Sequence, residues 1–175
     1  MTAKNKYIYL LLTIACFVGI ILIFVFDGYM GIYDTLLIDN GQFPQTIGSD
    51  QWRQQEEFGY PPSVSMERER SVSLTYTVEN HNFSAYNVDV SVSLWDGANK
   101  VADLATGRLS APAFGKAEIT AVLDAGQYIP AGYPTEQSYN LALVINRGGV
   151  ERKVMVYISP GIPKPGIIIP PPPTR

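Results

Sequence analysis

Alternation of apolar and polar side chains is the main pattern in the middle of the chain. In Ser71–Asn80, every second residue from Val72 to Val78 is apolar, and the residues between them are serines and threonines. Successive side chains of a strand point to opposite faces, so this pattern predicts a half-buried β-strand. Tyr86–Trp95 repeats it after a loop at Asn80–Ala85, and we expect the two strands to be antiparallel neighbours.

Further short segments have the same character and are separated by turn residues. The other expected strands are Thr35–Asp39, Lys100–Leu104, Arg108–Ser110, Ala117–Leu123, Tyr139–Ile145 and Val150–Ile158. The last two form a hairpin, because Asn146–Gly149 supplies residues that adopt positive φ. Only Asp50–Phe58 has a composition that favours a short turn or helix. Strands spaced by roughly ten residues predict an all-β antiparallel sandwich, with an open barrel as the less favoured alternative.

A long uncharged run precedes the strands. Between Tyr7 and Phe26, 14 of 20 residues are Leu, Ile, Val or Phe, and none is charged. As a helix the run is roughly 30 Å long, the thickness of a bilayer's hydrocarbon core. We therefore predict one transmembrane helix over residues 7–27, with Tyr7, Leu11, Phe17, Ile21 and Phe26 among the residues of a membrane anchor.

The charges around this run predict its orientation. Lys4 and Lys6 precede it and Asp27, Asp34 and Asp39 follow it. Because basic residues stay on the cytoplasmic side, we expect a single-pass protein of the cell membrane, with residues 1–6 in the cytoplasm and the C-terminal domain outside it.

Cleavage of the leader is the alternative to anchoring. Thr13–Cys16 loosely resembles a lipoprotein processing box, which would make Cys16 a lipidation site. Ten strongly apolar residues follow Cys16, whereas a processing site normally ends the apolar region. The anchor is therefore the preferred interpretation.

Composition divides the rest of the chain into three parts. Residues 28–69 form an aromatic-rich juxtamembrane segment with an early strand, residues 70–158 the β-sandwich core, and residues 159–175 a proline-rich tail with seven of the 13 prolines.

Three segments of the core resemble a known class of domains. Leu74–Asn80, Val88–Leu94 and Ala113–Ile119 are similar to the exported immunoglobulin-like and fibronectin-type-III-like domains of prokaryotic surface proteins. The resemblance covers residues 70–158 and implies an immunoglobulin-like fold. Leu74 or Tyr76 and Leu141 stand where an antibody-type domain has its cysteines, and Tyr139 stands at the tyrosine-corner position.

Charge and cysteine content exclude several kinds of partner. Between Gly28 and Ser159, nine basic residues face fifteen acidic ones, a net charge of −6. This sign opposes nucleic-acid binding. The single cysteine, Cys16, rules out an intramolecular disulfide and a thiolate metal cluster, and no sequence motif implies a cofactor.

The sequence predicts no catalytic site. His81, the single histidine, lies in an Asn-His-Asn loop without a nucleophile motif. Asp96, Asn99 and Asp103 do not have the spacing of a calcium loop, so turn chemistry is the better interpretation. Asn82-Phe83-Ser84 matches the N-glycosylation pattern and makes Asn82 a possible glycosylation site.

Aromatic residues are frequent in the juxtamembrane segment. Tyr29, Tyr33, Trp52 and Tyr60 are candidate partner-binding residues, the alternative being a collar packed against the sandwich base. In the tail, prolines favour an extended polyproline II stalk, yet Ile167, Ile168 and Ile169 are apolar enough to dock on a partner.

Two functions follow. The first is a non-catalytic, membrane-anchored, extracytoplasmic subunit that contacts the lipid bilayer and other membrane or envelope proteins. The alternative is a receptor-like module that binds a soluble ligand or glycan through the loops Asn80–Ala85 and Gly126–Glu136, with Tyr128 and Tyr133 as stacking groups.

Overall fold

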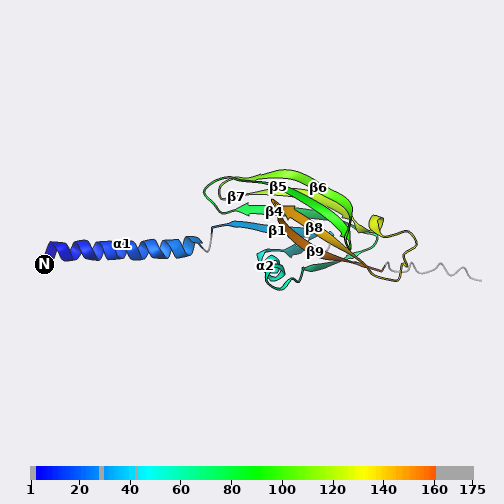
Figure 1. The fold of residues 1–175 in the computed structure, drawn as a ribbon, viewed down its shortest axis with the longest axis horizontal. Coiled ribbons are helices and arrows are strands. Elements are labelled where there is room, and N and C mark those ends of the chain that lie inside the picture. Colours follow the sequence, from blue (N-terminus) through cyan, green and yellow to red (C-terminus); the bar gives the residue numbers. More distant parts are fainter. Residues whose placement is uncertain (1–2, 28–29, 42, 161–175) are drawn as a thin grey trace, which may run out of the picture.

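The protein is an all-β domain preceded by one long helix (Figure 1). The computed structural model describes residues 3–27, 30–41 and 43–160. The elements are α1 (Ala3–Asp27), β1 (Ile32–Asp39), β2 (Gln45–Ile47), α2 (Ser49–Phe58), β3 (Ser63–Glu67), β4 (Ser71–Asn80), β5 (Tyr86–Asp96), β6 (Asn99–Ala111), β7 (Gly115–Asp124), the 3₁₀ helix η1 (Ala125–Tyr128), β8 (Tyr139–Arg147) and β9 (Val150–Ser159).

The strands form two sheets. One has the order β2-β1-β4-β7 and is antiparallel throughout; the other has the order β3-β9-β8-β5-β6. In the second sheet β3 runs parallel to β9, and every other pair is antiparallel. Parallel neighbours require a crossover in the chain, and β3 meets this requirement because it pairs with the last strand rather than with a sequence neighbour.

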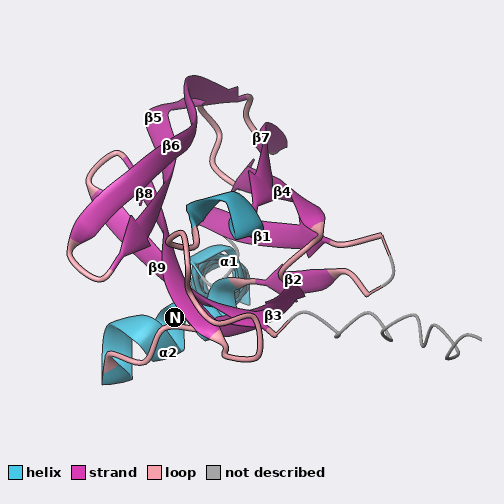
Figure 2. Ribbon diagram, turned by 90° about the vertical axis from the view of Figure 1, so that its right-hand side faces the viewer, coloured by secondary structure: helices cyan, strands magenta, loops and turns pink. Residues whose placement is uncertain are grey.

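The two sheets face each other (Figure 2), and the alternating apolar residues of both form one core. Leu74, Tyr76 and Val78 of β4 are buried as the period-two pattern predicts, and so are Val154, Val156 and Ile158 of β9. The hairpin between β8 and β9 also matches the prediction: Gly148 and Gly149 have φ values of 56° and 92°, which residues with a Cβ rarely adopt.

One prediction about strand pairing and one about strand bounds were wrong. β4 and β5 are not neighbours but belong to opposite sheets, because each has one apolar face and the two faces pack across the core. The two short strands expected at 100–104 and 108–110 are one continuous strand, β6, which pairs with β5 along its length. Neither β2 nor β3 was predicted.

The N-terminal segment is helical, as expected for residues 7–27. Within the described ranges, no helix has both the length and the apolar character needed to cross a membrane.

Two ends of the domain are defined by strand register. At the first end, which we call the α1 end, Ile32 of β1 pairs with Asn80 of β4. The loop at 81–85, which follows β4, and the turn at 112–114, which precedes β7, also lie at this end. At the opposite end, β9 finishes at Ser159, beside Glu67 of β3. Four residues separate α1 from β1, so the α1 end is the part of the domain nearest to the helix.

Candidate functional site

The predicted partner-binding tryptophan is part of the core. Trp52 of α2 is 1% exposed, and its Nε1 donates to the carbonyl oxygen of Asp34 at 3.1 Å. The prediction that Trp52 meets a partner was wrong, because the indole instead anchors α2 against β1. The collar packed against the sandwich, the alternative at this position, describes Trp52 correctly.

The other predicted partner-binding residues have different positions. Tyr33 is half-buried and its ring lies 4.9 Å from the ring of His81, measured between centroids. Tyr60 is 76% exposed and lies just beyond α2. Tyr29 and the three isoleucines of the tail, Ile167, Ile168 and Ile169, lie outside the described residues.

An ionic network, buried except for Glu56, joins the two sheets and α2. Asp34 of β1 is 3% exposed and accepts a hydrogen bond from the Tyr76 hydroxyl at 2.6 Å. On the facing sheet, Nε of Arg152 donates to the same carboxylate oxygen at 3.3 Å. The Arg152 guanidinium also binds the Glu56 carboxylate of α2 and lies 5.7 Å from the centre of the Trp52 ring. One arginine therefore connects β1, β9 and α2.

A second arginine is less well satisfied. Nε of Arg147 lies 4.0 Å from the Asp34 carboxylate, within ion-pair range but too far for a hydrogen bond. Within the described part of the chain, Nε and Nη1 of this buried side chain have no hydrogen-bond partner. The network thus contains two carboxylates and two guanidinium groups, and its formal charges cancel.

The surroundings of Tyr76 and Arg152 keep each of these two side chains in one protonation state. Burial, together with the negative charge of Asp34 and the hydrogen bond to it, raises the pKa of Tyr76 far above its ordinary value. Burial by itself would lower the pKa of Arg152, but the Glu56 hydrogen bond and the Asp34 charge outweigh it and the pKa is raised. The phenol therefore stays neutral and the guanidinium stays charged. This arrangement is suited to holding α2 in place rather than to proton transfer.

The chain between β1 and β3, residues 40–62, forms an insert that contains β2 and α2. Beside Met155, where pairing with β3 begins, the backbone N–H of Lys153 donates to the side-chain oxygen of Gln55 at 3.3 Å. The N–H of Met155 also donates to the carbonyl oxygen of Pro62 at 2.8 Å, so these two hydrogen bonds fix the insert to β9 in addition to the ionic network.

Two aromatic rings project from the end of this insert. Gly59 ends α2 with a φ of 72° and an N–H bonded to the Gln55 carbonyl at 2.9 Å. On either side of it, Phe58 is 65% exposed and Tyr60 is 76% exposed. We call Phe58 and Tyr60 the insert aromatics. Large exposed aromatics on a rigid support are typical of anchor residues in protein interfaces.

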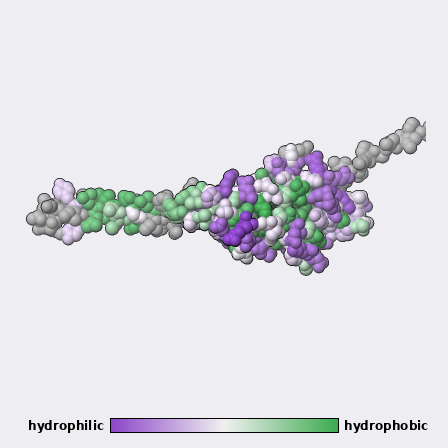
Figure 3. All heavy atoms as spheres, turned by 90° about the horizontal axis from the view of Figure 1, so that it is seen from above, coloured by the Kyte–Doolittle hydropathy of each residue, from purple (hydrophilic) through white to green (hydrophobic). Residues whose placement is uncertain are grey.

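The predicted anchor residues lie on α1. Tyr7, Leu11 and Phe17 are each exposed by 67 or 68%, and the side chains of Ile21 and Phe26 lie outside the described part. Figure 3 shows apolar residues along the visible face of α1 and mainly polar ones over the sandwich. The membrane role of these residues stays a prediction.

The loops expected to bind a soluble ligand are occupied by internal contacts. Tyr128 packs partly buried against the core. The Tyr133 ring lies edge-on to Tyr139, with 4.8 Å between centroids, and its hydroxyl donates to the carbonyl oxygen of Ser138 at 2.9 Å. Both rings therefore stabilise the loop that contains them.

Asn80 organises the other predicted ligand loop. Its fully buried amide donates to the carbonyl oxygens of Ser84, Ala111 and Pro112, at 2.8, 3.2 and 2.9 Å. Asn82, the possible glycosylation site, lies in this loop and is half-buried.

A groove lies on the outer face of the five-stranded sheet. It has a volume of about 340 Å³ and is lined by Trp95, Gly97, Ala98, Ala142, Val144, Glu151 and Lys153. The Trp95 ring is fixed by a hydrogen bond from Nε1 to the Ser93 hydroxyl at 2.9 Å. An aromatic wall with charged residues nearby provides both stacking and polar contacts for a small ligand.

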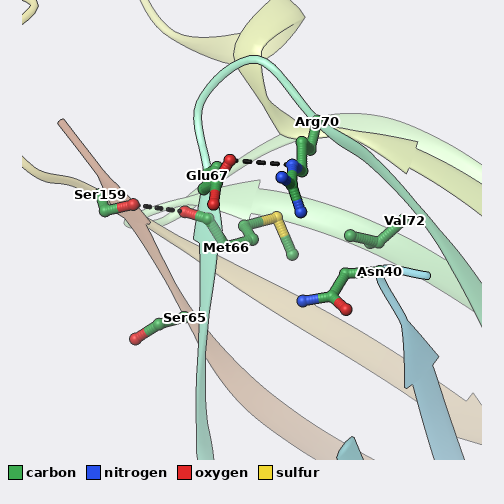
Figure 4. A pocket seen from close by; sticks show the side chains of 7 residues that line it. All are labelled: Asn40, Ser65, Met66, Glu67, Arg70, Val72 and Ser159. Atoms are coloured by element: carbon green, nitrogen blue, oxygen red, sulfur yellow. Dashed lines mark hydrogen bonds and ion pairs between the residues drawn. The ribbon is translucent and has the colours of Figure 1, made fainter. Parts of the chain in front are cut away.

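A smaller pocket of about 160 Å³ lies at the end opposite α1 (Figure 4). Arg70 and Glu67 form an ion pair at 2.8 Å on its wall, and the Ser159 hydroxyl donates to the Met66 carbonyl oxygen at 3.1 Å. Glu67 and Arg70 are thus paired with each other, and the Ser159 hydroxyl is bonded to backbone.

The residues considered for metal binding and catalysis make other contacts. Asp96 accepts a hydrogen bond from the Tyr139 hydroxyl at 2.6 Å, and Asp103 forms an ion pair with Lys100 at 2.9 Å. His81 lies 3.6 Å from Glu79 and packs on Tyr33. Among the described residues, no three histidine, cysteine or acidic side chains are grouped as a metal site would require.

The Tyr139 contact corrects one implication of the family resemblance. A tyrosine corner bonds to backbone a few residues upstream, whereas Tyr139 bonds to the side chain of Asp96 on β5. This hydrogen bond, followed by burial and the charge of Asp96, raises the pKa of Tyr139 to about 12.

Sequence reasoning missed the charged members of the network, although a signal was present. Asp34 is in phase with Leu36 and Ile38, and Arg152 is in phase with Val154. A charge on the apolar phase of a strand indicates a buried, paired group.

Comparisons with known proteins do not assign this chain to a protein family. No protein-family model matches the chain, and no curated protein matches it. A β-glucosidase from Listeria innocua in complex with glucose is similar over 58% of this chain and 15% of its own, with 12% identity and a TM-score of 0.41. A Pseudomonas fluorescens alkylpurine DNA glycosylase bound to DNA is similar over 56% of this chain and 27% of its own, with 12% identity and a TM-score of 0.35. The chain thus spans a small part of each, and similarity at this level assigns no function.

Proposed function

We propose that this protein is a non-catalytic, membrane-anchored accessory subunit whose extracytoplasmic immunoglobulin-like domain binds another membrane or envelope protein. The observation on which the proposal depends is the rigid insert. The buried Trp52 ties α2 to β1, the ion pair of Arg152 with the exposed Glu56 ties it to β9, and the insert ends in two exposed aromatic rings. A mobile loop would lose conformational entropy on binding, whereas a fixed one does not.

The strand arrangement supports the immunoglobulin-like part of the proposal. One sheet pairs β1, β4 and β7, and the other pairs β9, β8, β5 and β6. The N-terminal region contributes to both sheets, since β1 pairs with β4 and β3 runs parallel to the last strand, β9. Sandwiches of the immunoglobulin type also pack two sheets face to face and pair strands that are far apart in the chain, although their sheets are antiparallel, whereas β3 and β9 are parallel here.

The composition of α1 supports the membrane anchor. Nine large apolar side chains described on this helix are exposed: Tyr7, Tyr9, Leu11, Leu12, Ile14, Phe17, Val18, Ile20 and Leu22. An apolar surface of this size on a protein in water is unfavourable, and a lipid bilayer would cover it on all sides.

Copurification tests the partner interface. We would extract the full-length protein in mild detergent, with Phe58 and Tyr60 both changed to alanine, and compare it with the wild type by mass spectrometry of the associated proteins. The matched control is Phe43→Ala, because Phe43 is also 74% exposed but lies in the turn between β1 and β2. We expect the double variant to lose a stoichiometric partner that the wild type and the control retain.

Two results would contradict this function. Equal recovery of the partner with the double variant would rule out the insert aromatics as the interface. Extraction of the wild-type protein from membranes by high salt or carbonate alone, without detergent, would rule out the anchor, because a spanning helix resists both.

A second candidate function is binding of a soluble ligand or glycan in the groove beside Trp95. The half-buried ring and the adjacent Glu151 and Lys153 favour it. The chain has two tryptophans, so a Trp52→Phe variant reports on Trp95 alone by fluorescence. A saturable change on titration with oligosaccharides would support this candidate, and its absence across a broad panel would contradict it.

A further inference from the structure

Two loops meet at the α1 end of the domain. The loop at 81–85 follows β4, and the turn at 112–114 precedes β7. They are joined directly, since the N–H of Phe114 donates to the carbonyl oxygen of Asn82 at 3.3 Å. The N–H of His81 donates to the carbonyl oxygen of Gly31 at 2.9 Å, and Gly31 is only four residues beyond the end of α1.

An aromatic pair forms the tip of these loops. Phe83 is 70% exposed and Phe114 is 58% exposed. Their rings contact each other edge to face, with 4.9 Å between centroids and an angle of 86° between planes. Each ring comes from a different loop, so the pair is a tertiary feature that neither loop forms alone.

The support of this pair is rigid. The buried Asn80 amide holds the backbone of both loops through three carbonyl oxygens, and its side-chain oxygen accepts the N–H of Asn82 at 3.0 Å. The neighbouring turn is closed by a hydrogen bond from the N–H of Gly115 to the Pro112 carbonyl at 3.0 Å. The two rings are therefore presented in a fixed position.

Phe114 also has a backbone conformation that disfavours phenylalanine. Its φ is +53°, and it is the only residue other than glycine with a positive φ in the described part of the chain. Glycine would take this conformation without steric cost, so the backbone at this position does not favour a large side chain. An exposed ring kept at a strained position indicates that the ring itself has a use.

The position of the pair limits what it can contact. From Asp27 at the end of α1 to Ile32 at the start of β1, five Cα–Cα steps span at most about 18 Å. Ile32 pairs with Asn80, from which the loop at 81–85 starts. If α1 lies in a bilayer, both rings are held within reach of the headgroup layer on the side where α1 leaves it.

We propose that Phe83 and Phe114 insert into the interfacial layer of the bilayer that α1 spans, and so fix the orientation of the domain on the membrane. This inference rests on the proposed membrane anchor. Phenylalanine is among the residues that bury an apolar surface at the boundary between headgroups and lipid chains. Phe43 is exposed to a similar degree but lies at the opposite end of the domain, so it does not share this contact.

Depth-dependent fluorescence quenching tests the inference with the full-length chain in phosphatidylcholine vesicles. The native Cys16, exposed on α1, reports whether the helix is inserted. In a Cys16→Ser background, Ser84→Cys places a label beside Phe83 while both rings remain, and Ser138→Cys places one in an exposed loop at the opposite end. Each site carries an environment-sensitive fluorophore, and quenchers are attached to lipid chains near the headgroups or near the bilayer centre.

The expected pattern is specific. A label on Cys16 is quenched from the bilayer centre, the label at 84 loses about two-fold in intensity to the shallow quencher, and the label at 138 is unaffected. Combining Phe83→Ala with Phe114→Gly removes the quenching at 84. The glycine suits the positive φ, so unfolding of the loop does not explain the loss, and an unchanged melting temperature confirms this.

Three other outcomes overturn one proposal or the other. Quenching at Cys16 without quenching at 84 refutes bilayer insertion of the aromatic pair and leaves the anchor intact. Absence of quenching at both sites refutes the anchor and the inference that rests on it. Quenching at 84 that persists in the double variant refutes the role of the two rings.

Discussion

Arg152 on the last strand donates from Nε to the carboxylate of Asp34 on the first strand, at 3.3 Å and across 118 positions of the chain. Both side chains are buried. Because the same guanidinium binds Glu56, this one contact closes the sandwich and fixes the insert to it. The exposed position of Phe58 and Tyr60 depends on that closure.

The two buried arginines are predicted to differ in their contribution to stability. Arg152→Met removes the hydrogen-bonded partner of a buried carboxylate, which should cost about 3–5 kcal/mol in the free energy of unfolding. Arg147→Met removes a guanidinium that has two unsatisfied nitrogens, and should change stability by less than about 1 kcal/mol. Urea unfolding of the full-length protein in detergent measures both. Equal losses would mean that Arg147 shares the charge of Asp34 equally.

Trp52 and Tyr60 are predicted to have opposite roles, although both come from the aromatic-rich segment. Trp52→Ala leaves a cavity in the core and removes a hydrogen bond, so it should destabilise the domain by about 3–5 kcal/mol. Tyr60→Ala acts on a 76% exposed ring and should change stability by about 0.5 kcal/mol or less while weakening partner recovery. Thermal unfolding of both variants measures the difference. A Tyr60→Ala variant that is as destabilised as Trp52→Ala would contradict the prediction that the two residues have opposite roles.

Tyr139 is predicted to make stability depend on alkaline pH. Its pKa is raised to about 12 in the folded chain by the hydrogen bond to Asp96, against an ordinary value of about 10. A raised pKa means that the stabilising contribution is complete below pH 10 and is lost as the pH rises toward 12. Tyr139→Phe should therefore be less stable than the wild type by about 1 kcal/mol at neutral pH, and the difference should vanish in this range. A difference that is independent of pH would contradict the hydrogen bond's role.

Glycosylation of Asn82 and bilayer contact of Phe83 are predicted to exclude each other. A glycan on Asn82 would place a bulky polar group beside the ring that enters the lipid. We therefore expect Asn82 to be unmodified in protein isolated from its native membrane, as intact-mass spectrometry would show. A Ser84→Ala variant, which abolishes the acceptor pattern, should have the same mass as the wild type apart from the substitution. A glycan found at Asn82 would count against the bilayer contact.

Several strands could be predicted because the alternation of apolar and polar residues within each of them shows which side chains face the core. The bounds of β4 and the hairpin of β8 and β9 follow from alternation and from glycines that accept positive φ. The short strands β2 and β3, of three and five residues, were not predicted. Their pairing is decided by distant partners in β1 and β9.

The candidate interaction site was predictable only in part. The aromatic richness of residues 28–69 is visible in the sequence, but whether a ring is buried depends on what packs over it. Trp52 and Tyr60 differ because α2 turns the first toward Asp34, whereas Gly59 ends the helix before the second. Likewise Phe83 and Phe114, 31 positions apart, become a pair only through the Asn80 hydrogen bonds.

By itself, the sequence determined the all-β class, the phase of most strands and the long uncharged run before them, because alternation, turn residues and composition act over a few neighbouring positions. Tertiary structure alone decided which sheet each strand joins, that Asp34 and Arg152 meet, and which aromatics stay at the surface. The physical reason is that burial and charge pairing are properties of residues brought together from far apart, and no local pattern specifies those neighbours.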